Sequence, residues 1–192
     1  MSNAAKKIAT YEDLFDLPEN VVGEIIAGEL IVSPRPASTH AHATSILGMY
    51  IGTPFQLGRG GPGGWWIVDE PEIHFGEHVL VPDLAGWQKD RMPAPPVNAP
   101  FYTLAPDWVC EVLSPSSART DRVRKLPIYA HEGVRWLWLV DPRSRTIEAF
   151  RRQDSNWLLI GVHSGEERAR IEPFDAVDFE IGALWVASPP VE

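Results

Sequence analysis

Two acidic residues lie in apolar surroundings, where a charge needs a partner. Glu111 interrupts the apolar run "WVCEVLSPS", and Asp83 follows Pro82 in "VLVPDLAGW". Burial of a lone carboxylate is costly, so each must be paired or must bind a cation. Carboxylates on neighbouring strands offer the oxygen ligands that Mg²⁺ prefers. A cation held there can lower the pKa of bound water and stabilise charge on a phosphate, so the two acids favour metal-dependent phosphate chemistry.

A lysine on the predicted helix that follows the Glu111 strand suits the same chemistry. Lys125 lies in "DRVRKLPIYA", and an ammonium group near the acids could orient an attacking water or neutralise phosphate oxygens. Structural ion pairs also place acids in strands. In that alternative, Asp83 ends a strand or caps a turn, and Glu111 pairs with an arginine such as Arg119 or Arg122. Spacing alone does not decide between the two interpretations.

Three further polar residues could assist the site. His40 could contact a phosphate or help to activate water, and a solvated helix start is the simpler alternative. Asp121 and Tyr129 lie one helical turn before and after Lys125. They could orient the lysine, the first through an ion pair and the second through its hydroxyl group. Their alternative roles are charge at a helix N-terminus and packing in the core.

The composition restricts the partners of the chain. Seventeen basic and 26 acidic residues give a net charge of -9, which is not typical of a protein held to nucleic acid by bulk charge. A nucleic-acid contact would need divalent cations or a local basic patch, and the densest patch comprises Arg119, Arg122 and Arg124. The single cysteine, Cys110, excludes an intramolecular disulfide and an all-cysteine metal site. No apolar run could span a bilayer and no signal-peptide core is present, so a soluble cytoplasmic protein is expected.

The length and composition favour one domain. The 192 residues are 44% hydrophobic, which suits a single globular domain over 1–192 with a full core. Flexible tails are expected at 1–9 and 187–192, and the proline-rich segment 91–100 is expected to form a surface loop. The part of the chain after residue 146 is expected to be rich in β-structure.

The elements that must position the acids and the lysine follow from local patterns. Thr10 and Asp13 indicate a short helix, and Ala27-Gly28 lies at the centre of a predicted hairpin. Longer helices are expected at 37–57 and at 119–132, the second kinked by Pro127. The expected strands are 65–68, 72–75, 79–87, 107–113, 135–141, 146–151 and 157–163. A helix between two strands, in a chain otherwise rich in hairpins, favours a mixed α/β (α+β) fold in which helices pack on a mixed sheet.

Three motifs, taken in order, resemble the Uma-type restriction endonuclease family of the PD-(D/E)XK nuclease superfamily. They are "GEIIAGELIVSP", "VPDLAGW" and "APDWVCEVLSPSS…D…KLPIYAHEGVRWLWLVDP". The similarity extends from about residue 11 to residue 150, and its most distinctive part is 106–142. The resemblance implies a restriction-endonuclease-like core, in which helices flank a mixed central sheet, hairpins are added, and the site lies at one edge of the central strands.

The resemblance also implies roles for individual residues. Asp83 matches the metal-binding aspartate of the superfamily, Glu111 matches its second metal ligand, and Glu24 matches an acid that binds the metal directly or through water. The superfamily lysine is expected two residues after the glutamate, where this chain has Leu113, and Lys125 is its expected counterpart on the following helix. His40 falls at a position where family members often carry histidine.

The function that follows is hydrolysis of phosphodiester bonds in nucleic acid, with DNA as the expected substrate. Mg²⁺ is the expected cofactor, with Mn²⁺ as a substitute, and a homodimer is implied because nucleases of this superfamily often pair to cut both strands. The net charge of -9 and the leucine at position 113 favour an alternative. In it, the chain is a catalytically inactive nuclease-fold module that binds nucleic acid or protein. A third possibility is hydrolysis of a small phosphate compound.

Overall fold

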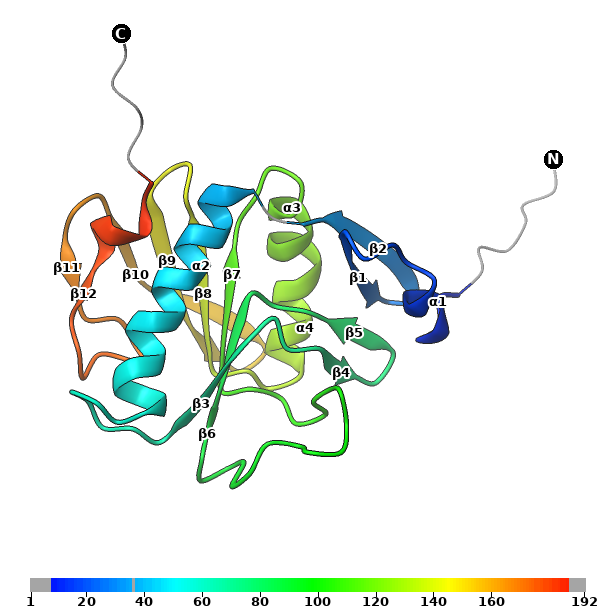
Figure 1. Ribbon diagram of the computed structural model, residues 1–192, viewed down its shortest axis with the longest axis horizontal. Coiled ribbons are helices and arrows are strands. Elements are labelled where there is room, and N and C mark those ends of the chain that lie inside the picture. Colours follow the sequence, from blue (N-terminus) through cyan, green and yellow to red (C-terminus); the bar gives the residue numbers. More distant parts are fainter. Residues whose placement is uncertain (1–7, 36, 187–192) are drawn as a thin grey trace, which may run out of the picture.

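A corner at residues 81–83 joins two β-sheets (Figure 1). The computed structural model describes residues 8–35 and 37–186. One sheet has four strands in the order β2-β1-β5-β4, and the other has six in the order β10-β9-β8-β7-β6-β3. The pairing of β7 with β8 is parallel, and the other pairings within both sheets are antiparallel. The protein therefore has the expected mixed fold, with few helices around a mixed central sheet.

The four-stranded sheet begins with a tight hairpin. Its turn consists of Ala27 and Gly28, whose φ angles are 51° and 69°, as in the two-residue turns that match the twist of paired strands. The backbone N–H of Ala9 donates to the carbonyl of Gly28, so the chain before α1 (Glu12–Phe15) is attached to this turn. The strands of this sheet are β1 (Val21–Ile26), β2 (Glu29–Pro34), β4 (Ile73–Phe75) and β5 (His78–Leu80).

The six-stranded sheet carries the strand–helix–strand unit that the sequence predicts. The chain leaves β7, passes through α3 (Ala118–Thr120), a π-helical turn (Asp121–Lys125) and α4 (Leu126–His131), and returns as β8 beside β7. The strands of this sheet are β3 (Trp65–Asp69), β6 (Leu84–Gln88), β7 (Trp108–Val112), β8 (Trp136–Asp141), β9 (Thr146–Gln153) and β10 (Asn156–Ser164).

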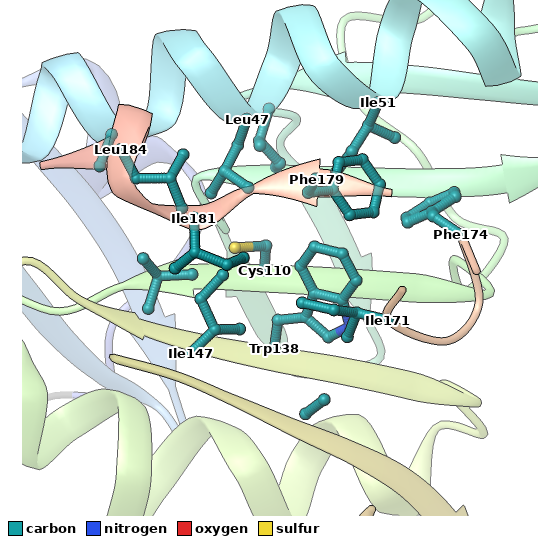
Figure 2. Packing of buried hydrophobic residues seen from close by; sticks show 14 of the residues in the cluster. Leu47, Ile51, Cys110, Trp138, Ile147, Ile171, Phe174, Phe179, Ile181 and Leu184 are labelled. Atoms are coloured by element: carbon teal, nitrogen blue, oxygen red, sulfur yellow. The ribbon is translucent and has the colours of Figure 1, made fainter. Parts of the chain in front are cut away.

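Two apolar clusters cover opposite faces of the six-stranded sheet. Alternate residues of β7 separate them: Trp108 and Cys110 belong to one cluster, and Val109 belongs to the other, as the two-residue period of a strand requires. The first cluster joins α2 (Ser38–Ile51) to the C-terminal segment with β11 (Arg168–Ala169) and β12 (Phe179–Glu180) (Figure 2). The second contains Tyr129 of α4, so α2 and α4 lie against opposite faces of the sheet.

Three predicted elements differ from those observed. The expected strand 79–87 is two strands in different sheets, β5 and β6, because Pro82 has no N–H to donate to a neighbouring strand. The expected helix 37–57 ends as an α-helix at Ile51 and continues as the π-helical turn Gly52–Gln56, which contains Pro54.

The helix expected at 119–132 is also interrupted rather than kinked. Pro127 lies in the first turn of α4, where its missing N–H costs little, and the wide turn Asp121–Lys125 precedes it. Gly133, with a φ of 87°, ends the helix as expected.

The ends of the chain complete the comparison with the predicted elements. Beyond β10 the described part of the chain has only the two-residue strands β11 and β12 and the short 3₁₀ turn Ile181–Leu184. Of the predicted tails 1–9 and 187–192, residues 1–7 and 187–192 lie outside the described residues, whereas Ala9 is hydrogen-bonded to Gly28. Within the described part, no helix is long and apolar enough to cross a membrane.

Candidate active site

Glu111 points toward the helix that follows its strand. It shares a face of β7 with Val109 and Leu113, which belong to the apolar cluster that also contains Tyr129 of α4. The carboxylate is 2% exposed, yet it is not isolated. The Tyr129 hydroxyl donates a hydrogen bond to Glu111 Oε1 at 2.6 Å, and Lys125 Nζ lies 2.9 Å from the same oxygen.

Asp83 reaches the same place from the corner between the sheets. β6 pairs with β7 so that Leu84 faces Cys110, which sets Asp83 beside Glu111 on the neighbouring strand. The backbone N–H of Val112 donates to Asp83 Oδ2 at 2.7 Å, and His40 Nε2 lies 3.1 Å from Asp83 Oδ1. Asp83 is therefore fixed on one side by the sheet and on the other by α2.

The four-stranded sheet contributes a third acid. Glu24 lies on β1 and is 6% exposed. The backbone N–H of Val81, at the corner between the sheets, donates to Glu24 Oε1 at 2.8 Å. Lys125 Nζ lies 2.8 Å from the same oxygen. The ammonium group therefore bridges the carboxylates of Glu24 and Glu111, one from each sheet.

The π-helical turn brings a fourth acid to this ammonium group. Asp121 Oδ1 lies 3.5 Å from Lys125 Nζ, and both side chains are buried. Wide turns of this kind occur often at functional sites. Here the turn directs Asp121 and Lys125 inward together, while Arg122 and Val123 between them are exposed.

The buried acids and the lysine of this cluster have shifted pKa values. Burial raises the pKa of Glu111 well above its ordinary value; Lys125 opposes this rise, but the repulsion from Asp121 and the other acids supports it. Burial likewise raises the pKa of Asp121. Burial lowers the pKa of Lys125, but the attraction of Glu111, Glu24 and its other neighbours outweighs this, so the pKa lies well above its ordinary value. Lys125 is therefore held as a cation by its acidic neighbours, and these carboxylates outnumber it.

Tyr129 and His40 hold the acids in place. Burial, followed by repulsion from Glu111, raises the pKa of the Tyr129 hydroxyl well above its ordinary value, so the hydroxyl keeps its proton and donates it. Burial lowers the pKa of His40, but its hydrogen bond to Asp83 and the charge of Asp83 more than compensate, and the net direction is upward. His40 is thus buried against an acid, so the predicted alternative of a solvated helix start is wrong.

One pocket of about 230 Å³ is lined by the four acids, Lys125 and His40. The β1–β2 hairpin forms one side, through Val22, Ser33 and Arg35, and the turn at residues 114–117 forms the other. The serines of this turn bond to one another: Ser114 Oγ lies 2.9 Å from Ser116 Oγ and 3.0 Å from Ser117 Oγ. Ser114 therefore stabilises the turn through its side chain.

The donor set suits a hard divalent cation. Glu24, Asp83, Glu111 and Asp121 offer carboxylate oxygens, and Lys125 is the one lysine or arginine side chain in contact with them in the described residues. A cation would relieve the repulsion that raises the pKa of Glu111. Among the described residues, no three His, Cys, Asp or Glu side chains converge as a ready-made metal site. The ammonium group of Lys125 lies between the carboxylates instead.

The other predicted residues lie apart from this cluster. Glu111 pairs with Lys125 rather than with an arginine. Arg122 pairs with Glu148 at 2.7 Å, and Arg124 pairs with Glu29 at 2.9 Å, so both are engaged within the chain. Arg119 is exposed and does not line the pocket. Leu113, where the resemblance led us to expect a lysine, packs in the apolar core.

Sequence reasoning missed Arg35, which lines the pocket from the end of the hairpin. The one signal in the sequence is its setting, a basic residue between two prolines in "SPRPAS". This setting predicts a fixed, non-helical backbone. It does not predict which part of the molecule the side chain meets, because that depends on how the two sheets join.

Comparisons with known proteins agree with this fold. The family described as "Uma2: Putative restriction endonuclease" matches residues 9–183. A solved structure described as a "putative nuclease belonging to DUF820", from Anabaena variabilis, is 25% identical and superposes with a TM-score of 0.73. The match covers 92% of this chain and 97% of that chain. A search of curated proteins gave no match.

Proposed function

The chain belongs to the Uma2 family of restriction-endonuclease-like proteins, and on this premise we propose that it is a divalent-cation-dependent endonuclease. The observation that carries the proposal is the gathering of three acids around one lysine. Lys125 contacts Glu24 and Glu111, one from each sheet, and Asp83 lies beside Glu111 in the lining of the same pocket. Burying so many charges together in an apolar core is costly, which favours a functional role for them.

In the proposed mechanism, Asp83, Glu111 and Glu24 hold Mg²⁺, for which Mn²⁺ can substitute. The cation, when bound, lowers the pKa of a water ligand and offsets charge on the phosphate. Lys125 keeps its proton because its pKa lies well above the ordinary value, so it acts as a hydrogen-bond donor and not as a base. It orients the attacking water or stabilises the negative charge of the transition state.

The neighbouring groups position the acids in this proposal. His40 fixes Asp83, and Tyr129 fixes Glu111, each through the contacts described above. Asp121 holds the ammonium of Lys125 from the helix side. Water adds to phosphorus, the bond from phosphorus to the leaving sugar oxygen breaks, and the proton lost by water is returned to solvent while the leaving oxygen gains one.

The proposal extends to the substrate and the assembly. DNA is the proposed substrate, and a homodimer would allow both strands to be cut; the proposed location is the cytoplasm. Plasmid and oligonucleotide cleavage with Mg²⁺ or Mn²⁺ tests the activity. We expect the wild type to cleave DNA. The cleavage rate should fall at least about a hundredfold in Asp83→Ala and Glu111→Ala, as it does when an enzyme loses a group that stabilises charge in the transition state.

The competing function is a nuclease-fold module that binds without catalysis. The observation in its favour is that Lys125 occupies the space between Glu24 and Glu111. Titration calorimetry with Mn²⁺ separates the two functions. Binding that disappears in Asp83→Ala supports the nuclease. No heat of binding at millimolar metal would discard the metal-dependent mechanism and leave the module.

A further inference from the structure

Arg35 lies where three hollows of the surface meet. The catalytic pocket, a hollow beside α1 and β1, and a hollow along α2 all have Arg35 in their lining. Each hollow has at least three acidic residues in its lining, including Glu70, which all three share. Among the described residues, Arg35 and the buried Lys125 are the only arginine or lysine side chains in the lining of these hollows.

The guanidinium of Arg35 is held in place without being neutralised. Its Nε and Nη2 donate to the carbonyl oxygen of Glu19 at 3.2 and 3.1 Å. The described residues provide no ion-pair partner for it, and its Nη1 has no hydrogen bond to them. A guanidinium fixed on one side and free on the other is pre-organised to donate to a phosphate oxygen.

Three of the other cations near the site are committed elsewhere. Lys125 is buried between Glu24 and Glu111. Arg122 and Arg124 form ion pairs with Glu148 and Glu29 on their own surfaces, and Arg119 does not line the pocket. Among the described residues that line the pocket, Arg35 is therefore the one positive group without an ion-pair partner.

We propose that Arg35 binds a phosphate of the substrate at the mouth of the catalytic pocket, and so admits a phosphodiester chain to an otherwise acidic site. This inference rests on the proposed function and adds a residue and a ligand group to it. The contact uses the free Nη1 of the guanidinium, and the ligand is a non-bridging phosphate oxygen. The sequence-based basic patch at Arg119, Arg122 and Arg124 is not required for it.

The test measures binding and cleavage side by side. A fluorescein-labelled DNA oligonucleotide is titrated with wild type, Arg35→Ala and Arg35→Lys in Ca²⁺, and anisotropy is followed at several salt concentrations. Cleavage of the same oligonucleotide is followed in Mg²⁺. Arg59→Ala is the matched control, because Arg59 is an exposed arginine in the glycine-rich loop and lines none of the three hollows.

We expect Arg35→Ala to weaken binding about tenfold or more, as a charge-assisted hydrogen bond would. The slope of log affinity against log salt should become shallower by about 0.9, the value for one lost phosphate contact on duplex DNA. Arg35→Lys should keep the salt slope while recovering only part of the affinity, because lysine lacks the fork that Glu19 holds. Arg59→Ala should match the wild type in both quantities.

Each outcome decides the inference and the proposed function separately. If the wild type cleaves and Arg35→Ala retains both its affinity and its salt slope, the inference is wrong and the nuclease stands. If the wild type binds through Arg35 and does not cleave, the inference stands and the nuclease falls. If the wild type neither binds nor cleaves, both are rejected. If Arg59→Ala loses as much DNA affinity as Arg35→Ala, the inference is also wrong, because the effect would then come from the overall charge of the protein.

Discussion

Replacement of Lys125 by methionine tests whether this ammonium group holds the metal-free site together. Methionine has similar length and no charge, so Lys125→Met removes the cation and little packing. The lysine is 2% exposed, and its Nζ lies 2.8 Å from Glu24 and 2.9 Å from Glu111. Loss of one partner from a buried ion pair costs about 3–5 kcal/mol. Since whole domains are stable by only about 5–15 kcal/mol, this is a large fraction of the total.

The loss of stability caused by Lys125→Met should depend on pH. The pKa of Glu111 is already raised in the folded protein, and loss of the attraction of Lys125 would raise it further. A carboxyl group with a raised folded pKa adds stability below its unfolded pKa and loses it as pH rises through the folded pKa. The destabilisation of Lys125→Met should therefore be largest at mildly alkaline pH and smallest at mildly acidic pH, where Glu111 and Asp121 take up protons.

A divalent cation should replace the missing ammonium group. Binding to the folded state alone adds about 2.7 kcal/mol at a hundredfold excess over Kd. Mg²⁺ should therefore raise the unfolding midpoint of Lys125→Met more than that of the wild type. Urea unfolding followed by tryptophan fluorescence provides the measurement, since Trp108 and Trp138 lie in the core.

The control variant is Arg122→Met, on the same turn as Lys125. Arg122 and Glu148 form an exposed ion pair with side chains 41% and 29% exposed, and such pairs contribute only about 0–1 kcal/mol. A Lys125→Met variant that loses less stability than Arg122→Met at alkaline pH would refute the reasoning. Equal losses of stability at acidic and alkaline pH would refute it as well, because the cost would then come from packing.

Three more outcomes follow from the same contacts. Glu111→Gln should unfold at higher urea than the wild type at alkaline pH without metal, by on the order of 1 kcal/mol, because it removes the acid whose raised pKa costs stability there; lower stability at that pH would contradict this. Tyr129→Phe should lower kcat with little change in KM and weaken Mn²⁺ binding in calorimetry, since it removes the 2.6 Å donor to Glu111; an unchanged Mn²⁺ affinity would show that the hydroxyl does not position the acid. Cys110 should react with a thiol reagent only on unfolding, because burial raises its pKa well above the ordinary value; rapid labelling of the folded protein would contradict its place in the core.

Local patterns in the sequence predicted the parts of the site that a single strand or helix determines. Glu111 was predicted to lie within a buried strand, and the alternation of β7 accounts for its direction toward α4. The unit from β7 to β8 was predicted from the same stretch of chain. Lys125 was predicted on the helix that follows, and the structure places it against Glu111. These features can be predicted because they depend only on the two-residue period of a strand and on a short connection to the next helix, both visible in the sequence.

Features that depend on contacts between the two sheets could not be predicted in this way. The run 79–87 has a continuous apolar character, so it was assigned to one strand, whereas Pro82 divides it between two sheets. The direction of Asp83 and the bond from Val81 to Glu24 both result from this division. The position of Arg35 depends on where the hairpin lies against the corner. The periodicity of apolar residues predicts single strands and helices, but not how distant parts of the chain pack together.

Positions 113 and 125 illustrate how a strand or a facing helix could each bring a side chain to the same acid. A side chain at 113 lies on the same face of β7 as Glu111, so a lysine there would reach the acid along the strand. In this chain Leu113 completes the apolar cluster beside Tyr129 instead. The ammonium group then comes from the facing helix, across the same space, and the wide turn Asp121–Lys125 directs it inward with its own acid partner. The positive charge beside Glu111 therefore depends on the packing of the turn against the sheet rather than on the strand.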